Sequence, residues 1–330
     1  MTDTGASPRV SVALCTHNGD RYLAEQMRSI FAQSVAPQEI IVSDDASSDS
    51  TVALVEQLRS EAAPIEVRLL RNSAPLGVTA NFERAIAAAS GDFVALCDQD
   101  DVWHPQKLER MLRTFASSPG LLLVHTDARI VDEGGRPSGA SLFETLRVSA
   151  TERARVHAGD AISVLLRRNI VTGATTVLRR ELATRAMPFP GAWVHDEWLA
   201  IVAAATGRID LLEELLIDYR QHGGNQIGAS TLTGRGRIGR LSAPRTERNA
   251  RLLARAVALA ERMTQLEPAP TEAAIRGAED VLAHERARSA LPSSRVRRIA
   301  PVVREWRTGR YSTCGLGLQD VVRDLVQPAR

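Results

Sequence analysis

The sequence predicts an α/β protein with a mainly parallel β-sheet that helices cover on both faces. Strand-like and helix-like stretches alternate from residue 9 to residue 125. The strand-like stretches are continuous apolar runs, which are typical of parallel strands buried on both sides. Polar clusters follow three of these runs. Because ligands bind beyond the carboxyl ends of the strands in such sheets, we expect the functional site there.

The first half of the chain supplies most of the predicted elements. Strands are expected at 9–15, 39–43, 65–70, 93–97 and 121–125, where Val, Ile, Leu and Ala dominate. Between them, apolar residues recur at helical spacing and predict helices over 20–34, 52–58, 78–89 and 105–115. Ser47 to Ser50 offer N-caps to the second of these helices, and Pro105 suits the start of the fourth.

The second half is less regular. Residues 130–160 show a weak pattern with loop-forming glycines, 170–178 predict a strand with an internal glycine, 195–205 predict a helix and 211–219 a last strand. Residues 223–245 have the composition of a linker, and helices are expected at about 246–264, 271–290 and 295–307. We therefore predict two domains, an α/β domain over 1–230 and an Arg-rich helical C-terminal extension over 231–330.

Composition narrows the class of protein. The chain has 330 residues, and no stretch approaches the roughly 18 apolar residues that a membrane-spanning helix needs. The first residues do not have the pattern of a secretory signal. The three cysteines, Cys15, Cys97 and Cys314, are odd in number and far apart, unlike a disulfide framework. We expect a cytoplasmic protein.

Charge differs between the two predicted domains. Residues 1–230 hold 22 basic and 29 acidic residues, and residues 231–330 hold 19 and 10, giving −7 and +9. The basic residues of the tail lie beside apolar ones: Arg297, Arg298, Arg304, Arg307 and Arg310 beside Val302, Val303 and Trp306. This pattern fits a basic amphipathic segment at the anionic inner face of the cell membrane. The alternatives are a solvated helix that packs on the first domain, or a homodimer contact. A nucleic-acid partner is not expected.

An acidic cluster follows the strand at 93–97. Asp98, Asp100 and Asp101 place three carboxylates within four residues, and such a cluster is stable only if it is solvated or binds a cation. A hard divalent ion that also accepts diphosphate oxygens would suit it. The alternative is a capping cluster for the helix at 105. The second acidic pair, Asp44-Asp45, at a neighbouring strand end favours a ligand site.

One further motif, a dinucleotide-binding pattern, lacks the structural context that it requires. Residues 234–239 satisfy the dinucleotide-binding pattern GxGxxG, but no strand precedes them. Patterns of P-loop, zinc-protease and serine-hydrolase sites do not occur in the sequence.

The motifs in order carry a resemblance to a known family. The segments are VSVALCTHNGDRYLAEQMRSIFAQS, EIIVSDDASSDST and GDFVALCDQDDVW, then NIVTGATTVLRREL, HDEWLA and YRQHGGNQIG. Together they resemble the family 2 inverting glycosyltransferases of the GT-A fold, and the later three are similar to bacterial rhamnosyltransferase-like members. The resemblance covers about 9–230 and, weakly, the ending GRYSTCGLGLQDVVRDL. It implies a GT-A nucleotide-diphospho-sugar transferase fold, Rossmann-like with a mainly parallel sheet, followed by an α-helical extension.

The resemblance also implies a binding site for a nucleotide-sugar donor. The residues near the strand ends that would hold its nucleoside are Thr16, Asn18, Asp44 and Asp45. Asp98 would contribute to the same donor site. A carboxylate there can accept the N3–H of uracil or thymine, or a ribose hydroxyl. Asp98 and Asp100 would be the DxD pair that binds Mg²⁺ or Mn²⁺. His222 would be a further metal ligand or contact the diphosphate.

Inversion requires a base on the face opposite the leaving group. The resemblance places it at Asp196, with Glu197 as the alternative and a mere N-cap role for Asp196 as the other reading. Residues expected near the donor or acceptor sugar are Asp101, Trp103, Gly173, Trp198 and Arg220. The two tryptophans would stack on sugars, with buried packing as the alternative. Gly173 would let the backbone approach a sugar closely.

The predicted function is therefore a metal-dependent inverting glycosyl transfer from a dTDP- or UDP-linked sugar to a cell-surface glycan or a polyprenyl-linked acceptor. Rhamnose is favoured by the resemblance alone, and UDP-linked hexoses or galactofuranose stay open. One alternative is a sugar-1-phosphate nucleotidyltransferase, although the loop THNG after the first strand lacks that class's Gly-rich, basic composition. The other is a non-catalytic module that binds nucleotides or glycans.

Overall fold

A computed structural model describes residues 8–223 and 244–328, which divide into two compact units. The first contains 8–153, 171–203 and 207–223 among these residues, and the second contains 154–170, 204–206 and 244–328. The predicted boundary at 230, most of the predicted linker and the GxGxxG motif lie outside the described ranges. The predicted division into two domains therefore stays a prediction.

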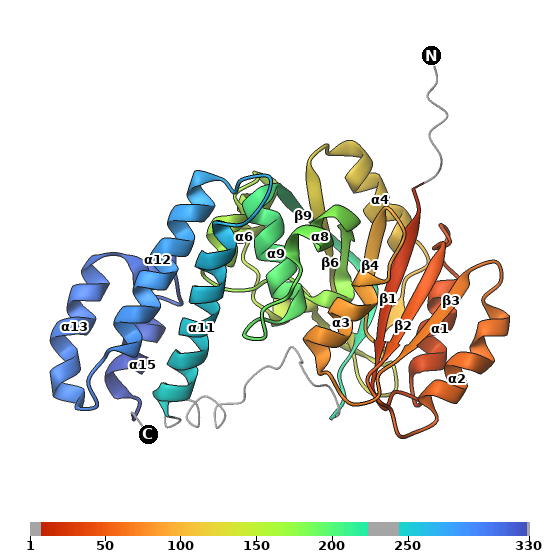
Figure 1. Ribbon diagram of the computed structural model, residues 1–330, viewed down its shortest axis with the longest axis horizontal. Coiled ribbons are helices and arrows are strands. Elements are labelled where there is room, and N and C mark those ends of the chain that lie inside the picture. The colour runs from red at the N-terminus through yellow and green to blue at the C-terminus, as the bar shows by residue number, and fades with distance from the viewer. Residues whose placement is uncertain (1–7, 224–243, 329–330) are drawn as a thin grey trace, which may run out of the picture. The chain divides into compact units, whose positions relative to one another are not determined.

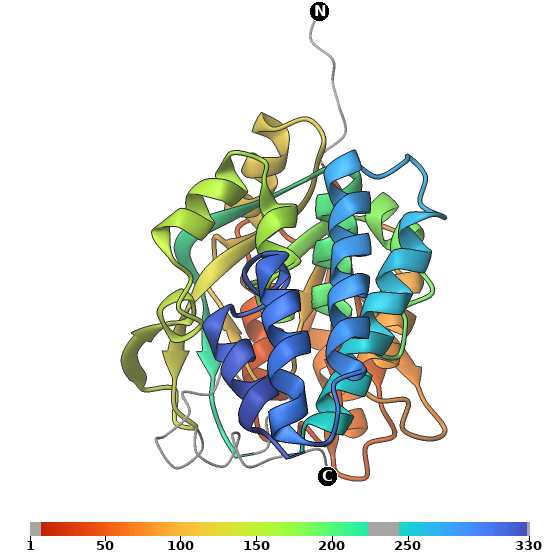
Figure 2. The same ribbon diagram turned by 90° about the vertical axis from the view of Figure 1, so that its left-hand side faces the viewer.

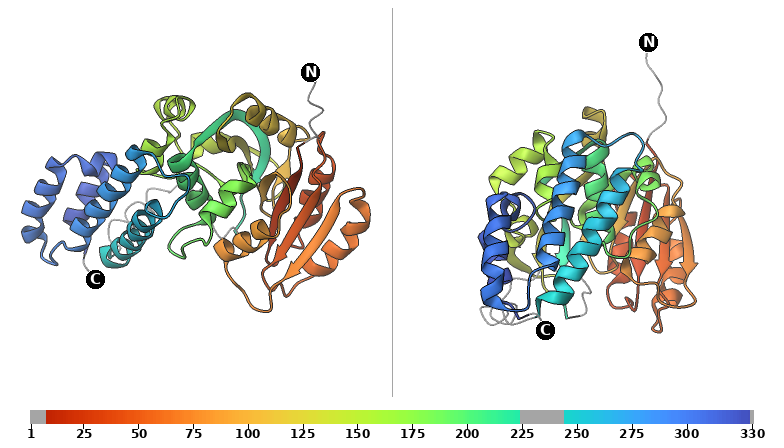
Figure 3. Two further views of the ribbon diagram at one scale, coloured as in Figure 1. Left: turned by 45° about the horizontal axis from the view of Figure 1, so that its top comes forward. Right: turned by 60° about the vertical axis from the view of Figure 1, so that its left-hand side comes forward.

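The first unit is built on one mixed, mostly parallel sheet (Figures 1 and 3). Its strands are β1 (Val10–Thr16), β2 (Glu39–Asp44), β3 (Glu66–Arg71), β4 (Phe93–Cys97), β5 (Val102–Trp103), β6 (Leu121–Val131), β7 (Pro137–Ser141), β8 (Thr176–Arg179) and β9 (Arg208–Arg220). They are ordered β3-β2-β1-β4-β8-β6-β9-β5, with β7 paired to β6. β3, β2, β1 and β4 are mutually parallel, whereas β8 runs antiparallel to both of its neighbours. The predicted α/β class is confirmed.

Helices cover both faces of the parallel part. Those of the first unit are α1 (Leu23–Phe31), α2 (Thr51–Leu58), α3 (Val78–Ala87), α4 (Lys107–Ser117), α5 (Leu142–Thr145), α6 (Ala150–His157), α8 (Arg180–Ala186) and α9 (His195–Thr206). Two of these helices, α6 and α9, begin in the first unit and end in the second. Apolar residues of β1, α1, α2 and α4 form one core cluster. On the other face α3 packs on β1 and β2, where Ser43 donates a hydrogen bond to Asn81 at 2.7 Å.

Strand register decides where the polar clusters meet. Thr16 is paired with Asp44 across β1 and β2, and Leu14 with Cys97 across β1 and β4. The residues that follow these strands therefore emerge at the same edge of the sheet. The sequence predicted this edge as the site.

The predicted strand over 170–178 is shorter in the structure. Only β8 is extended, and it is preceded by the 3₁₀ turn η2 (Gly173–Thr175). The Thr172 carbonyl accepts hydrogen bonds from the Thr175 amide at 3.0 Å and from the Thr176 hydroxyl at 2.9 Å, and these bonds close the turn. Side-chain hydroxyls thus compete with strand formation here.

The second unit is helical, as predicted. It contains α7 (Ala161–Leu165), α11 (Arg245–Met263), α12 (Glu272–Ser289), α13 (Arg295–Arg307), α14 (Arg310–Thr313) and α15 (Leu318–Val326). α11 and α12 lie side by side, and α13, α14 and α15 pack together (Figures 1 and 2). None of the helices in the described ranges has the length and apolar composition needed to cross a membrane.

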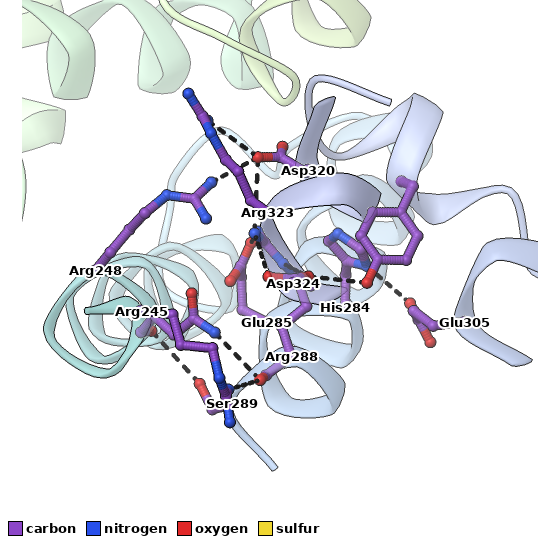
Figure 4. Close-up of polar contacts among 12 residues, drawn as sticks. Arg245, Arg248, His284, Glu285, Arg288, Ser289, Glu305, Asp320, Arg323 and Asp324 are labelled. Atoms are coloured by element: carbon purple, nitrogen blue, oxygen red, sulfur yellow. Dashed lines mark hydrogen bonds and ion pairs between the residues drawn. The ribbon is translucent and has the colours of Figure 1, made fainter. Parts of the chain in front are cut away.

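Charged groups fill much of the interior among α12, α13 and α15 (Figure 4). Arg288 donates to Asp324 at 2.7 Å and to Glu285 at 2.8 Å, and Tyr311 donates to Asp324 at 2.8 Å. Arg288 and Asp324 are 2% and 0% exposed. Buried ion pairs of this kind hold one geometry, because any unpaired member would remain buried as an isolated charge.

Replacing Arg288 should therefore destabilise the protein strongly. We expect Arg288→Met to lower the free energy of unfolding by about 3–5 kcal/mol, because Asp324 and Glu285 would stay buried without their cation. The matched control is Arg276→Met on the exposed side of the same helix, which should change it by less than about 0.5 kcal/mol. Urea unfolding followed by circular dichroism compares the two. Equal effects of both substitutions would contradict a structural role for the buried pair.

Candidate functional site

The loops after β1 and β2 are joined through Asp44. This residue is buried, and its carboxylate accepts hydrogen bonds from the hydroxyls of Thr16 at 2.9 Å and Ser47 at 2.5 Å. Asn18 has a positive φ of 48° and accepts a hydrogen bond from the Ser48 amide at 2.8 Å. The structure thus brings together three of the predicted nucleoside-binding residues.

Asp45, the fourth of them, holds a neighbouring loop. One of its oxygens accepts from the Asn72 side chain at 2.8 Å and the Leu76 amide at 2.7 Å, and the other accepts from the Gly77 amide at 2.9 Å. These bonds fix residues 72–77 beside the end of β2. The Asp45 carbonyl also bonds to the His17 ring at 2.8 Å.

A clamp that the sequence did not reveal joins the loops after β1 and β4. The Gln99 side chain accepts from the His17 amide at 2.8 Å and donates to the His17 carbonyl at 3.1 Å. A Cβ on Gly19 would lie 2.1 Å from Oε1 of Gln99. Glycine is thus required at this position as long as the clamp keeps its geometry.

The acidic cluster after β4 is crowded. Burial, reinforced by the charges of Asp100 and Asp196, raises the pKa of Asp98 to about 7. Burial and the charges of Asp100 and Asp98 raise the pKa of Asp101 well above its ordinary value. One carboxylate oxygen of Asp101 is buried without a hydrogen-bond partner among the described residues. The cluster therefore holds more negative charge than its surroundings neutralise.

Tyr219 on β9 shows which carboxylates share this region. Burial raises the pKa of its phenol, and the charges of Asp101, Asp98, Asp100 and Asp196 raise it further. Asp196 comes from α9, about a hundred residues along the chain from the other three. The fold thus brings the predicted base near the predicted metal-binding pair.

Arg220 at the end of β9 supports the acidic loop. Its Nε donates to the Asp100 carbonyl at 2.8 Å, its amide donates to Asp101 at 3.0 Å, and its Nη2 donates to Glu25 at 2.6 Å. Its side chain is 3% exposed. His222, two residues on, lies with Nε2 2.8 Å from a carboxylate oxygen of Asp100.

The predicted metal ligands Asp98, Asp100 and His222 do not form a closed site. Across residues 8–223 and 244–328, no three His, Cys, Asp or Glu side chains are grouped so as to hold a metal ion by themselves. The donor set still suits a hard cation, because it consists of carboxylate oxygens with a surplus of negative charge. Any metal here would need further ligands from water or a bound molecule.

Asp196 is the second residue of α9, and the N-cap is Val194. One Asp196 oxygen accepts from the Gly173 amide at 2.9 Å, and the other accepts from the Glu197 amide at 2.7 Å. A carboxylate in a first helical turn is favoured by the helix dipole. The reading of Asp196 as an N-cap does not apply to this geometry.

Gly173 is needed for close packing against α9. A Cβ at this position would lie 2.8 Å from Nε2 of His195, whose ring stacks on Phe82 with centroids 3.9 Å apart. The close approach that the sequence predicted is therefore present, but its partner is a protein side chain.

The predicted sugar platforms Trp103 and Trp198 are wrong. Trp198 is fully buried and donates its indole N–H to the Ala186 carbonyl at 2.8 Å. Trp103 is 3% exposed, and the Nζ of Lys107 lies 3.5 Å from its ring centroid. Both rings are used in packing, so neither offers a free face to a sugar.

Lys107 is a residue of this site that sequence reasoning missed. Its side chain is fully buried and donates to the Ala174 carbonyl at 2.8 Å. Burial lowers the pKa of its ammonium to about 7, against the opposing effect of Cys97, Asp101 and Asp98. The available signal was that this is the only lysine among 41 basic residues.

The sequence and the fold identify the family. Residues 11–182 match the family model of glycosyl transferase family 2, and the chain belongs to this family. This confirms the predicted family and, at that level, the predicted glycosyltransferase class of enzyme. The rhamnosyltransferase-like subgroup stays a prediction.

Individual relatives agree with this assignment. The chain is 30% identical over 224 residues to an uncharacterized glycosyltransferase of Nostoc sp. (strain PCC 7120), covering 66% of each chain. A Mycobacterium bovis protein is 28% identical over 215 residues, and 59% of its length is covered. The chain thus spans about two thirds or less of the length of these curated relatives.

Solved structures confirm the GT-A fold. S. aureus TarS 1-349 in complex with UDP-GlcNAc superposes with a TM-score of 0.57 at 18% identity, covering 92% of this chain and 75% of that one. The mannosyltransferase PcManGT from Pyrobaculum calidifontis, in complex with GDP-Man and Mn²⁺, gives a TM-score of 0.54 at 19% identity, covering 97% and 86%.

Removal of the buried lysine should be costly. We expect Lys107→Met to lower the free energy of unfolding by about 1–3 kcal/mol, because the buried Ala174 carbonyl would lose its donor. Arg113→Met, on the exposed side of the same helix, is the control and should change it by less than about 0.5 kcal/mol. Chemical denaturation of both variants measures the difference. A Lys107→Met protein as stable as the parent would contradict this role.

Proposed function

We propose that this protein is a metal-dependent inverting glycosyltransferase, which transfers a sugar from a nucleoside diphosphate to a hydroxyl group of a cell-surface glycan or lipid-linked acceptor. One observation carries the proposal. Carboxylates from two distant segments are held around one turn: the Gly173 amide of η2 donates to Asp196, and the adjacent Ala174 carbonyl accepts from Lys107, which lies in the electrostatic environment of Asp98 and Asp101. An inverting transfer needs one acidic group for the leaving diphosphate's cation and a separate one for the acceptor's proton.

The nucleoside would bind to the loops after β1 and β2. Thr16 is bonded to Asp44, whereas Asn18 and Asp45 accept hydrogen bonds from the amides of Ser48 and Leu76, so the geometry of these residues is set before the donor binds. The structural neighbours support a nucleotide-sugar donor, since one holds UDP-GlcNAc and another GDP-Man. Their nucleotides differ, and our preference for dTDP or UDP rests on the sequence resemblance, as does rhamnose.

Asp98 and Asp100 would hold the divalent ion, with the donor's diphosphate completing its coordination. Mg²⁺ is commonly bound by one or two carboxylates and substrate phosphates, in agreement with the open arrangement of this cluster. When bound, Mg²⁺ or Mn²⁺ would supply a Lewis acid that neutralises the diphosphate leaving group. His222 would orient Asp100 through their hydrogen bond, or join the coordination when the donor is present.

Asp196 would act as the general base. The acceptor oxygen attacks the anomeric carbon, its proton passes to the Asp196 carboxylate, and the bond between sugar and diphosphate breaks with its electron pair on the diphosphate. The Gly173 amide keeps this carboxylate in position. Glu197, the next residue of the helix and also partly exposed, is the alternative base.

Arg220 and Asp101 would position the metal-binding loop instead of contacting the sugar. The Arg220 side chain donates to the Asp100 carbonyl, and the Arg220 amide donates to the Asp101 side chain. The side chains of Arg220 and Asp101 are both buried. We therefore assign Arg220 to the support of the DxD pair, not to contact with the donor or acceptor sugar.

Metal dependence can be tested at Asp100. A thermal-shift screen of nucleotide sugars with and without Mn²⁺ would first identify the donor, since a ligand at about 100 times its Kd adds about 2.7 kcal/mol of stability. Asp100→Asn should then abolish the Mn²⁺-dependent part of donor binding in calorimetry, because a charged ligand is lost. The control is Asp92→Asn, at the opposite end of the same strand. Metal-dependent binding that persists in Asp100→Asn would refute the assignment.

The base can be tested separately from donor binding. Asp196→Asn keeps the size of the side chain but cannot take a proton, so the transfer rate should fall by about 10² to 10⁴. Donor affinity with metal should stay nearly unchanged, because the proposed role of Asp196 is toward the acceptor. Paired calorimetry and transfer kinetics on Asp196→Asn and Glu197→Gln decide between the two acids. An active Asp196→Asn beside an inactive Glu197→Gln would move the base to Glu197, and activity in both would remove this segment from catalysis.

A further inference from the structure

Helices α13 and α15 of the second unit expose apolar side chains to solvent. On α13 the exposed fractions reach 77% for Val296 and 56% for Trp306, and on α15 they reach 71% for Leu318. The full set of exposed large apolar residues on these helices is Val296, Ile299, Val303, Trp306, Leu318, Val322 and Val326. Single exposed apolar residues are ordinary, but seven on two helices that pack together are not.

Their spacing places them on one face of each helix. The four on α13 follow one another at intervals of three, four and three residues, and the three on α15 at intervals of four. Such intervals return to the same side of an α-helix. Each helix therefore carries a continuous apolar stripe on its outer side.

The inner sides of the same helices combine apolar residues, Val302 and Val321, with buried charged ones. Arg298 is fully buried and donates to the carbonyls of Pro292 at 2.7 Å and Gln327 at 2.6 Å, and Glu305 is bonded to His284 at 2.8 Å. On α15 the buried positions include Asp320 and Asp324 (Figure 4). The exposed apolar stripes are therefore additional to the apolar residues that face the interior, whereas the apolar stripe of a surface helix usually faces the core alone. Arg298 and Val302, which the sequence analysis included in the basic amphipathic segment, are both buried.

Charge on the outer side has one sign. The three acidic residues between 291 and 328 are Glu305, Asp320 and Asp324, and all are buried. The exposed ionisable residues of the same stretch are four arginines, Arg295, Arg297, Arg304 and Arg307. The outer side therefore combines an apolar stripe with uncompensated positive charge.

We propose that this α13–α15 surface, the seven apolar residues together with the four arginines, docks on the surface of an anionic lipid bilayer. The arginines would bind lipid phosphates, and the apolar side chains, with Trp306 among them, would enter the boundary between headgroups and acyl chains. A soluble polyanion would leave the apolar stripe in water. A symmetric dimer would bring the arginines of two copies together with no carboxylate between them. The proposal does not depend on the proposed transferase activity.

The test is co-sedimentation of the full chain with vesicles of phosphatidylcholine, with and without phosphatidylglycerol. We expect binding only to the anionic vesicles, weakened by salt. Arg297→Gln/Arg304→Gln should lower the partition coefficient by about fivefold per arginine. Ile299→Ser/Trp306→Ser should lower it by about tenfold or more, because apolar area no longer leaves water.

The control is Ile275→Ser/Arg276→Gln, a pair of exposed residues of the same two types on α12, which should bind vesicles like the parent. Circular dichroism and thermal unfolding should be unchanged in every variant, because the substituted side chains are exposed. Absence of binding by the parent, or equal binding by all variants, would overturn the proposal. So would a parent dimer in light scattering that Ile299→Ser/Trp306→Ser converts to monomer without any vesicle binding, which would assign the surface to self-association.

Discussion

The burial of several neighbouring carboxylates at the edge of the sheet is the constraint on which the candidate site depends. Asp98, Asp100 and Asp101 follow one buried strand, and the fold adds Asp196 to their electrostatic environment. Burial raises the pKa of Asp98 and Asp101 most, and the charges of neighbouring carboxylates raise it further; buried carboxylates of this kind destabilise the folded state unless cations offset them. The remaining features of the site are responses to this charge.

Two buried basic side chains lie beside the cluster, and of these Lys107 lowers the pKa of Asp98 and Asp101 through its charge. Lys107 approaches from α4, and Arg220 approaches from the end of β9. Neither neutralises the cluster fully, since the pKa of Asp98 is still raised to about 7 and one oxygen of Asp101 lacks a partner among the described residues. A divalent cation brought with the donor would offset the rest.

The sequence was informative where short-range rules apply. Apolar runs and turn residues predicted the parallel strands, and their carboxyl ends predicted the edge at which Thr16, Asp44 and Asp98 meet. It failed where a side chain has two plausible uses that only packing distinguishes. Trp103 and Trp198 have the chemistry of sugar platforms, yet both are buried, with Trp103 against Lys107 of α4 and Trp198 bonded to Ala186 of α8. Lys107, Gln99 and Arg220 bind across loops that are distant in sequence, and no local pattern encodes such contacts.

The same reasoning explains the outward apolar stripes of the second unit. A sequence of alternating arginines and apolar residues predicts an amphipathic helix but does not say which side faces inward. In α13 the charged residues Arg298 and Glu305 face the interior beside Val302, because Arg298 donates to several carbonyl groups and Glu305 bonds to a histidine. The direction of an amphipathic helix is thus decided by partners on other elements, here α12 and α15.

One short turn connects the acidic loop, which is the proposed metal site, with the helix that carries the proposed base. Within η2, the Ala174 carbonyl accepts from Lys107 and the Gly173 amide donates to Asp196. These two adjacent residues therefore bind both α4, which follows the acidic loop, and α9, which carries the proposed base. A 3₁₀ turn closed by threonine hydroxyls is stiff, and the close packing of His195 leaves no room for a Cβ at Gly173. The separation between the metal end and the base end would therefore be fixed by three residues. A transfer reaction that must place a leaving group and a nucleophile on opposite faces of one carbon requires such a fixed separation.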